Sequence, residues 1–347
     1  MRFSKTLIHW YSNNKRMLPW RQTKDPYFIW LSEIILQQTQ VAQGLPYYTR
    51  FTEKFPTVFH LAKAEEGDVL KLWQGLGYYS RARNLHASAK YISNDLNGKF
   101  PNTYKDLLKL KGVGDYTASA IASICFNEPA AVVDGNVYRV LARYFGIDTP
   151  INSSKGAKEF KELAQTVIDK SDPATFNQAI MEFGSTQCKP QNPDCTVCPF
   201  KQSCIAFNEN RIAELPVKLK AAKVKIKHFN FLVLLSHDGK TILEKRIGKG
   251  IWQNLYQFPL IETEENSSFE AFKPQVEQHP LLKTNTFELS LYNEEAIVHK
   301  LSHQHLYTKF WIVNVSDSLE NGIATNQIRK YAVPILIGNF IERFNFD

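Results

Sequence analysis

Four cysteines in the short stretch 188–204 restrict the fold of this chain more than any other feature. They are Cys188, Cys195, Cys198 and Cys204, with the spacing C-x6-C-x2-C-x5-C. The N-terminus has no apolar signal segment, so we expect an intracellular chain in which such thiols bind metal and form no disulfides. A structural zinc site usually pairs two short Cys-x2–4-Cys knuckles, and only one is present here. We therefore favour a [4Fe–4S] cluster with a structural role over zinc, and a redox role stays open.

The pattern of apolar residues changes after this loop. Before residue 187 it is helical, which predicts an all-α domain over residues 1–210. Residues 211–226 are polar and basic and are interpreted as a linker. Residues 227–347 predict a separate α+β domain, with two strands joined at Asp238-Gly239, a further strand in TKFWIVNV and a closing helix in YAVPILIGNFIERF.

The charge is uneven along the chain. The net charge is +8, and the basic surplus lies in residues 1–226, whereas residues 227–347 are slightly acidic. This favours a polyanion as the partner of the first part, although a basic protein without such a partner has the same sum. No apolar run approaches the roughly 20 residues of a membrane span, so we expect no membrane association.

A glycine-containing turn separates two predicted helices at about 105–125. It reads Lys111-Gly112-Val113-Gly114. Two glycines permit a tight turn, and the unpaired N–H groups that start the next helix can bind an anion. The turn is therefore a candidate phosphate clamp that does not read sequence, with an ordinary helix–helix turn as the alternative.

Two carboxylates are candidates for catalysis. Glu33 lies on one helical stripe with Gln37 and Gln40, which looks more like a lined groove than a solvated face. Asp134 stands inside an apolar run, where a charge is seldom buried unless it is paired or functional; a helix N-cap is the other reading. Such a pair could divide its work between a protonated acid and an ionised stabiliser.

The segment 75–83 combines flexible glycines, Tyr78 and the two arginines Arg81 and Arg83. These residue types suit a wedge into stacked bases with phosphate contacts. A core tyrosine and two solvated arginines would have the same sequence.

Together these segments resemble the helix-hairpin-helix DNA glycosylases with an iron–sulfur loop, and most closely the A/G-specific adenine DNA glycosylases, the MutY family. The resemblance extends over essentially the whole chain. It is carried by the four cysteines and by WLSEIILQQTQV (30–41), GLGYYSRARNLH (75–86), LKGVGDYTASA (110–120), VDGNVYRV (133–140) and FNQAIMEFG (176–184).

The resemblance implies that adenine opposite 8-oxoguanine or guanine is flipped from the duplex and released. Glu33 would protonate adenine N7, and Asp134 would stabilise or capture the oxocarbenium-like sugar. Other implied roles are positioning around the sugar (Tyr116, Asn136), DNA contacts and insertion into the stack (Gln37, Gln38, Thr39, Tyr78), and lining of the adenine pocket (Gln178, Arg21, Trp20).

Tyr116 separates this chain from the sister family of endonuclease III-like enzymes. Those enzymes resemble this domain but carry a lysine two residues after the second glycine, which attacks the sugar as a Schiff-base nucleophile. A phenol cannot form an imine. We therefore expect a monofunctional glycosylase without efficient strand cleavage.

The C-terminal domain resembles the MutT-like (Nudix) domain of the same family. It lacks the metal-binding helix pattern G-x5-E-x7-R-E-x2-E-E, so binding without hydrolysis is expected. Leu301-Ser302-His303 lies where the family often has Phe-Ser-His, a loop that reads 8-oxoguanine, and Leu301 departs from that pattern. A polar loop or a metal site that includes His299 and His305 is the alternative.

The expected partner is double-stranded DNA with A·8-oxoG or A·G mispairs. We expect a monomer, cytoplasmic and acting on the nucleoid as in bacteria, and the sequence names no protein partner. An endonuclease III-type glycosylase/lyase and a non-catalytic iron–sulfur DNA-binding or redox-sensing protein are the two rival functions.

Overall fold

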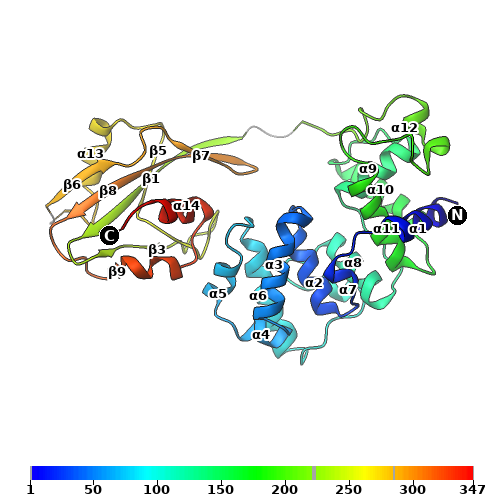
Figure 1. The fold of residues 1–347 in the computed structure, drawn as a ribbon, viewed down its shortest axis with the longest axis horizontal. Coiled ribbons are helices and arrows are strands. Elements are labelled where there is room, and N and C mark those ends of the chain that lie inside the picture. Colours follow the sequence, from blue (N-terminus) through cyan, green and yellow to red (C-terminus); the bar gives the residue numbers. More distant parts are fainter. Residues whose placement is uncertain (1, 221–223, 284–285, 347) are drawn as a thin grey trace. The chain divides into compact units, whose positions relative to one another are not determined.

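The structure, a computed structural model, describes residues 2–220, 224–283 and 286–346. The chain divides into two compact units, whose elements are drawn in Figure 1. The first comprises residues 1–63 and 84–220, and the second comprises residues 64–83 and 221–347. The predicted fold class, a helical domain followed by an α+β domain, is confirmed.

The first unit is built from helices joined by short turns. These are α1 (Arg2–Asn14), α2 (Pro26–Leu36), α3 (Val41–Lys54), α4 (Val58–Lys63), α6 (Ser80–Asn94, whose first four residues belong to the second unit), α7 (Tyr104–Leu107), α8 (Asp115–Phe126), α9 (Gly135–Phe145), α10 (Ser154–Val167), α11 (Pro173–Thr186) and α12 (Ile205–Asn208), with 3-10 turns η1 (Pro19–Arg21) and η2 (Lys201–Ser203).

The hairpin between α7 and α8 matches the predicted glycine turn. The Thr103 side chain caps α7 by accepting a hydrogen bond from the backbone N–H of Asp106. Gly112 has φ +78°, and a β-carbon there would meet the Asn84 side chain at 2.8 Å, so glycine is required at this position. Gly114 then forms the N-cap of α8, which leaves the first N–H groups of that helix at the turn.

The second unit is centred on a five-stranded sheet. Strand β1 (Lys225–Ser236) pairs in parallel with β8 (Gln304–Val315) and antiparallel with β5 (Leu260–Thr263). On its other edge β8 pairs antiparallel with β6 (Phe287–Leu291) and with β7 (Ile297–Lys300). Two small ladders join β2 (Lys240–Thr241) to β9 (Ile323–Ala324) and β3 (Glu244–Lys245) to β4 (Tyr256–Gln257).

Helices cover both faces of this sheet, as Figure 1 shows for α13 (Phe269–Glu277) and α14 (Ile335–Arg343). On one face the Phe272 ring of α13 stacks on Trp311, with ring centroids 4.4 Å apart. On the other face Phe340 of α14 stacks on Phe310 at 4.1 Å. Successive residues of β8 thus point to opposite apolar layers, as the two-residue period of a strand dictates. The 3-10 segment η3 (Thr325–Lys330) completes the unit.

Residues 64–83, including α5 (Glu66–Leu72), belong with this sheet although they lie within the predicted helical domain. The side chain of Lys71 donates to the carbonyl of Tyr331 at 3.1 Å, and the Tyr79 hydroxyl to that of Val333 at 3.4 Å. Asn254 donates to Glu66 at 2.7 Å. These contacts join segments far apart in the chain, which local sequence patterns do not reveal.

The predicted hairpin at Asp238-Gly239 is wrong in its pairing. The turn exists, because the N–H of Gly239 donates to the carbonyl of Ser236, but β2 pairs with β9 and not with β1. At the turn the backbone N–H of Lys240 donates to the Ser236 side chain at 3.2 Å, so a side chain and not a ladder bond to β1 closes it. The predicted linker 211–226 also differs, since residues 225–226 start β1 and residues 221–223 lie outside the described residues.

No helix in the described ranges has the length and apolarity to cross a membrane.

Candidate active site

Two cavities with shared walls lie in the first unit. The larger is a cleft of about 1030 Å³ between the end of α2, the start of α8 and the start of α9. The smaller, about 160 Å³, shares Glu33, Tyr116, Asp134 and Asn136 with the cleft. Three helix ends therefore bring the two predicted carboxylates to one place. The size of the second cavity suits a flat ring system rather than a whole nucleotide.

Glu33 is buried in α2, with 8% of the residue exposed, so the predicted groove and not a solvated face is correct. Burial raises the pKa of its carboxyl to about 7, and the negative charge of Asp134 adds to this. The interactions with Tyr116 and Arg21 pull the pKa the other way, less strongly. Glu33 is thus a carboxylic acid that can hold a proton near neutral pH.

Asp134 is a helix N-cap and also lies at the two cavities, so the two readings of its sequence position do not exclude each other. Its carboxylate caps α9 by accepting hydrogen bonds from the N–H groups of Asn136 (2.9 Å) and Val137 (2.8 Å). It also lines both cavities and accepts a 2.9 Å bond from the Asn136 side chain. Burial raises its pKa, while these donors and the charge of Arg139 act in the opposite direction.

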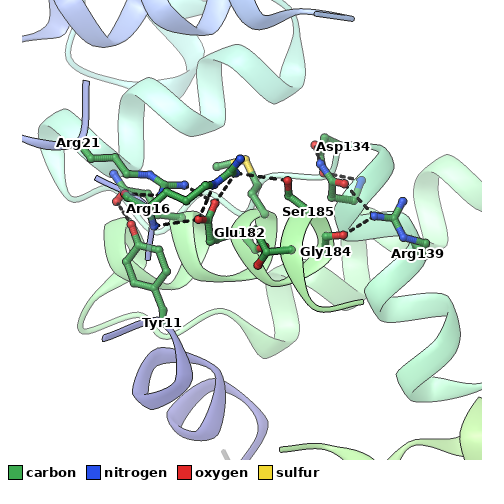
Figure 2. Close-up of polar contacts among 12 residues, drawn as sticks. Tyr11, Arg16, Arg21, Asp134, Arg139, Glu182, Gly184 and Ser185 are labelled. Carbon is green, nitrogen blue, oxygen red and sulfur yellow. Dashed lines mark hydrogen bonds and ion pairs between the residues drawn. The ribbon is translucent and has the colours of Figure 1, made fainter. Parts of the chain in front are cut away.

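Arg139 connects this carboxylate to the cysteine loop. Its guanidinium donates to the Asn136 side chain (2.8 Å), to the carbonyl of Gly184 (2.5 Å) and to the carbonyl of Cys188 (2.8 Å). Figure 2 shows Arg139 between Asp134 and Gly184. Gly184 must be small because a β-carbon would meet Asn136 at 2.6 Å, so α11 packs closely on the start of α9.

A third carboxylate, Glu182, also lines the smaller cavity. It is fully buried, and Figure 2 shows it held between Arg16 and Arg21. Arg16 donates through its backbone N–H and two side-chain nitrogens, at 2.6–3.0 Å, and Arg21 donates at 2.8 Å. Burial alone would raise the pKa of Glu182, but the two arginines overcome it and lower the pKa to about 2.

The remaining predicted pocket residues line the same cavity. Trp20 is buried in η1, and Gln178 accepts a hydrogen bond from the Tyr11 hydroxyl at 2.8 Å. The Tyr116 hydroxyl donates to the thioether of Met181 at 3.1 Å, and the surrounding burial raises the pKa of this phenol well above its usual range. The cavity thus offers aromatic, amide and guanidinium groups to a ligand.

Some of the residues predicted to contact DNA line the larger cleft. Gln37, Gln38 and Thr39 line it, as does Gly114, and Gln37 donates to Thr117 on α8 at 3.1 Å. Gln38 is exposed and has φ +53°, a conformation that few non-glycine residues adopt. In the hairpin Lys111, Gly112 and Gly114 are exposed, whereas Val113 is buried and anchors the turn.

The predicted residues of the second unit line a different cavity, of about 480 Å³. Tyr78, with 48% exposed and φ +46°, lines it together with Leu301, Ser302 and His303. Trp252 and His299 form part of its wall, with ring centroids 5.9 Å apart. The cavity therefore brings the predicted wedge and the predicted lesion-reading loop together.

Arg81 and Arg83 differ from the prediction that they hold phosphates. Arg81 is buried and donates to the carbonyls of Leu76 and Gly77, and burial lowers its pKa to about 10. Arg83 donates to the carbonyl of Gln253 at 2.8 Å. The two guanidinium groups thus support the loop that carries Tyr78. A basic residue type does not reveal that its donors are already used by backbone carbonyls.

The four cysteines line one small cavity of about 30 Å³ between α9, α11 and α12. None of them forms a disulfide. Phe183 and Phe200 form apolar walls, and Arg143 donates to the sulfur of Cys188 at 3.6 Å. No group of three or more His, Cys, Asp or Glu side chains in the described part of the chain is arranged to hold a single metal ion. The donor set and the apolar wall fit an iron–sulfur cluster.

Sequence reasoning missed Arg16, Met181, Glu182 and Arg139. For two of them a signal existed: Met181 and Glu182 follow the predicted pocket residue Gln178 by three and four positions, which places all three on one helix face. For Arg16 and Arg139 no local pattern was available, because their partners are distant in sequence or are backbone carbonyls.

The helical unit and its acid-lined cleft define a DNA glycosylase of the helix-hairpin-helix class. Residues 31–167 match the model of the HhH-GPD superfamily of base excision DNA repair proteins, and residues 230–343 match the NUDIX domain. A solved thymine-DNA glycosylase, described as thermostable, is similar with a TM-score of 0.55 and 32% identity, over 60% of this chain and 95% of that one. An endonuclease III–DNA complex, at 23% identity and a TM-score of 0.53, shares the fold over 60% of this chain and 95% of that one.

Similar proteins identify the particular family. The adenine DNA glycosylase of Buchnera aphidicola subsp. Schizaphis graminum is 34% identical, over 90% of this chain and 88% of that protein. That of Homo sapiens is 45% identical, over 59% of this chain and 39% of the human protein. The chain belongs to the adenine DNA glycosylase family, and the family predicted from the sequence is confirmed.

Proposed function

We propose that the protein hydrolyses the N-glycosidic bond of adenine opposite 8-oxoguanine or guanine. The observation that carries the proposal is the pair of carboxyl groups in one cavity: Glu33 with a pKa of about 7, and Asp134 with donors arranged around its carboxylate. An acid that can protonate the base and an anion that can stabilise the sugar are what this reaction requires. Family membership supports adenine as the base.

The proposed reaction begins when adenine enters the smaller cavity from the cleft. Glu33 gives its proton to N7, the bond between C1′ and N9 breaks, and the bonding electrons leave with the base. Asp134 stabilises the positive charge on the sugar, with Asn136 and Tyr116 positioning the groups around it. Water adds to C1′ and returns a proton to Glu33, so that the acid is restored.

Discrimination of the opposite base is proposed for the cavity of the second unit. Ser302 and His303 are exposed at its rim, and both side chains offer hydrogen bonds to a base edge. Leu301 replaces the aromatic residue frequent in the family, and an apolar side chain can still act as a wedge. Since the chain lacks the metal-binding helix of active Nudix enzymes, the domain is proposed to bind without hydrolysis.

We further propose that Cys188, Cys195, Cys198 and Cys204 hold a [4Fe–4S] cluster. Four thiols from one loop with a single short knuckle, which line one apolar cavity, support an iron–sulfur cluster over zinc. When bound, the cluster would pin the loop over 188–204 against Arg139 and Arg143. An iron and sulfide assay with a UV–visible spectrum tests the assignment; one zinc per chain would contradict it.

Single-turnover assays on matched duplexes test the activity. Duplexes with one A·8-oxoG, one A·T or one thymine glycol pair are incubated with the protein, and released base is measured. Fast release from A·8-oxoG alone is expected. Release of thymine glycol would favour an endonuclease III-type enzyme, and binding without release would favour a non-catalytic protein.

Strand cleavage distinguishes the two kinds of glycosylase. Because Tyr116 stands where the sister family has its lysine, the product should remain an intact strand with an abasic site until alkali is added. A strand break that forms without alkali as fast as the base is released would contradict this part of the proposal.

A further inference from the structure

Two bulky residues at the cavity of about 480 Å³ in the second unit have backbone conformations that side chains rarely adopt. Tyr78 has φ +46° and Trp252 has φ +61°. Positive φ is uncommon outside glycine, asparagine and aspartate, and for a bulky side chain it marks strain that the surrounding structure must hold. Such strain is typical of ligand clamps and other functional sites. The contacts that hold these two aromatic residues therefore bear on what the cavity does.

Trp252 begins a tight turn that ends at Leu255. The N–H of Leu255 donates to the carbonyl of Trp252 at 3.0 Å, and Asn254 within the turn has φ +66°. The turn directs the indole inward, since Trp252 is only 7% exposed. Its ring centroid lies 5.9 Å from that of His299 and 6.0 Å from that of Phe229. The conformation of the turn therefore sets the position of this wall of the cavity.

Two side chains of the segment 64–83 hold this turn. Arg83 donates to the carbonyl of Gln253 at 2.8 Å, and the Glu66 carboxylate accepts a 2.7 Å hydrogen bond from the Asn254 side chain. Glu66 and Arg83 also act on one another, because the charge of Glu66 opposes the fall in the pKa of Arg83 that burial causes. The strained turn is thus attached, by two adjacent residues, to the segment that carries the other strained aromatic residue.

We propose that Glu66 and Arg83 are positioning residues that fix Trp252 relative to Tyr78, and that this fixed cavity lets the protein tell 8-oxoguanine from guanine opposite adenine. The two bases differ only in an oxygen at C8 and a hydrogen on N7. Discrimination between them requires contact groups that are held to within about 0.5 Å. Glu66 and Arg83 act through the turn and not by contact with the base. The inference rests on the proposed role of this cavity in reading the opposite base.

Single-turnover adenine release from an A·8-oxoG duplex and an A·G duplex tests the proposal. For each duplex the rate is measured over a range of enzyme concentrations, which gives a limiting rate and a half-saturating concentration. The discrimination ratio is the quotient of these two values for A·8-oxoG divided by the same quotient for A·G. A fraction of unfolded protein lowers both quotients equally, so a loss of stability alone leaves the ratio unchanged.

Glu66→Ala removes the acceptor of the Asn254 side chain. We expect the discrimination ratio to fall about two- to tenfold, the size of one hydrogen bond. The fall should come from a higher half-saturating concentration for A·8-oxoG, with a limiting rate close to that of the wild type. Glu66→Gln keeps an oxygen acceptor at the same place and should restore most of the ratio. Glu65→Ala is the matched control, because Glu65 is exposed and its side chain makes no cap hydrogen bond.

Asn254 provides a second test of the same hydrogen bond. Glycine adopts positive φ without strain, so Asn254→Gly keeps the turn and removes the donor to Glu66. This variant should lose discrimination as Glu66→Ala does, and the double variant should lose no more than either one alone, since both remove one bond. Arg83→Met keeps the stem of the side chain and removes the donors to Gln253, and it should lower the ratio by a similar factor.

The outcomes distinguish two failures. If the wild type prefers A·8-oxoG and Glu66→Ala keeps the full ratio, the inference is overturned while the proposed function stands. The same holds if Glu66→Ala loses the ratio and Glu66→Gln does not restore it, or if the double variant loses the product of the two single effects. If the wild type has equal quotients for the two duplexes and Ser302→Ala changes neither, the proposed reading of the opposite base itself fails.

Discussion

Glu33 and Glu182 are both buried glutamates on helices that line one cavity, yet their pKa values move in opposite directions. Burial dominates at Glu33 and raises its pKa to about 7. At Glu182 burial acts in the same sense, but direct hydrogen bonds from Arg16 and Arg21 lower the pKa to about 2. The difference is therefore made by the cations that touch the carboxylate and not by depth in the protein.

This difference supports the proposed division of the cavity into a reactive part at Glu33 and a supporting part at Glu182. A carboxylate that two arginines hold ionised cannot give a proton at neutral pH, so Glu182 fixes the arginines and the wall of the pocket. A carboxyl without such a partner is destabilised when ionised, and this makes Glu33 an acid. We therefore expect a substitution of Glu33 to lower the rate of adenine release, and a substitution of Glu182 to lower the free energy of unfolding.

The largest effect is expected for Glu33→Gln. The variant keeps the shape of the side chain but cannot donate the acidic proton, so single-turnover adenine release should fall by about 10²- to 10⁴-fold. Binding of the mispaired duplex should change little in a filter or gel-shift assay. Glu53→Gln on the exposed side of α3 is the control. Retention of wild-type rates by Glu33→Gln would refute the acid assignment.

Two substitutions of Asp134 separate the effect of its helix cap from the effect of its negative charge. Asparagine caps a helix about as well as aspartate, so the free energy of unfolding of Asp134→Asn should lie within about 0.5 kcal/mol of that of the wild type. For Asp134→Ala the free energy of unfolding should be lower by about 1 kcal/mol. Both should release adenine at least 100-fold more slowly, because the stabilising charge is gone. If Asp134→Asn releases adenine normally, the residue is a helix cap alone.

How much the sequence predicts depends on whether the signal is local. The stripe of Glu33 with Gln37 and the glycine turn at Lys111–Gly114 are local signals, and Glu33, Gln37 and Gly114 line the cleft in the structure. The sequence leaves Asp134 open, because a helix cap and a catalytic carboxylate have the same sequence signal, and in the structure this residue caps α9 and lines the cavity.

What the sequence did not predict depends on distant partners. Glu182 has an ordinary position on an amphipathic helix, and its pKa is set by Arg16, far away in the chain. Arg81 looks like a phosphate ligand until its two carbonyl acceptors are known. The pairing of β2 with β9 likewise joins segments that are far apart in the chain.

Glu182→Gln should destabilise the protein strongly. It leaves Arg16 and Arg21 without their counter-charge beside a buried site, and breaking a buried ion pair on one side typically destabilises by about 3–5 kcal/mol. The free energy of unfolding in urea measures this. Glu162→Gln, at an exposed i,i+4 pair with Lys158, should stay within about 0.5 kcal/mol of the wild type. Equal effects at the two positions would mean that the arginine pair does not stabilise the fold.

The same comparison predicts how stability depends on pH. The pKa of Glu33 is higher in the folded protein than in the unfolded chain, so the folded state binds more protons between pH 4.5 and 7, and the wild type loses stability as the pH rises through that range. Glu33→Gln lacks this loss, so its advantage over the wild type should grow from near zero at pH 4.5 to about 3 kcal/mol above pH 7. For Glu182, whose folded pKa is lowered, the contribution is present above pH 4.5 and is lost as the pH falls toward 2. Urea unfolding of wild type and Glu33→Gln at pH 5, 6, 7 and 8 measures the first slope, and a constant difference across that series would mean that Glu33 does not titrate near neutral pH.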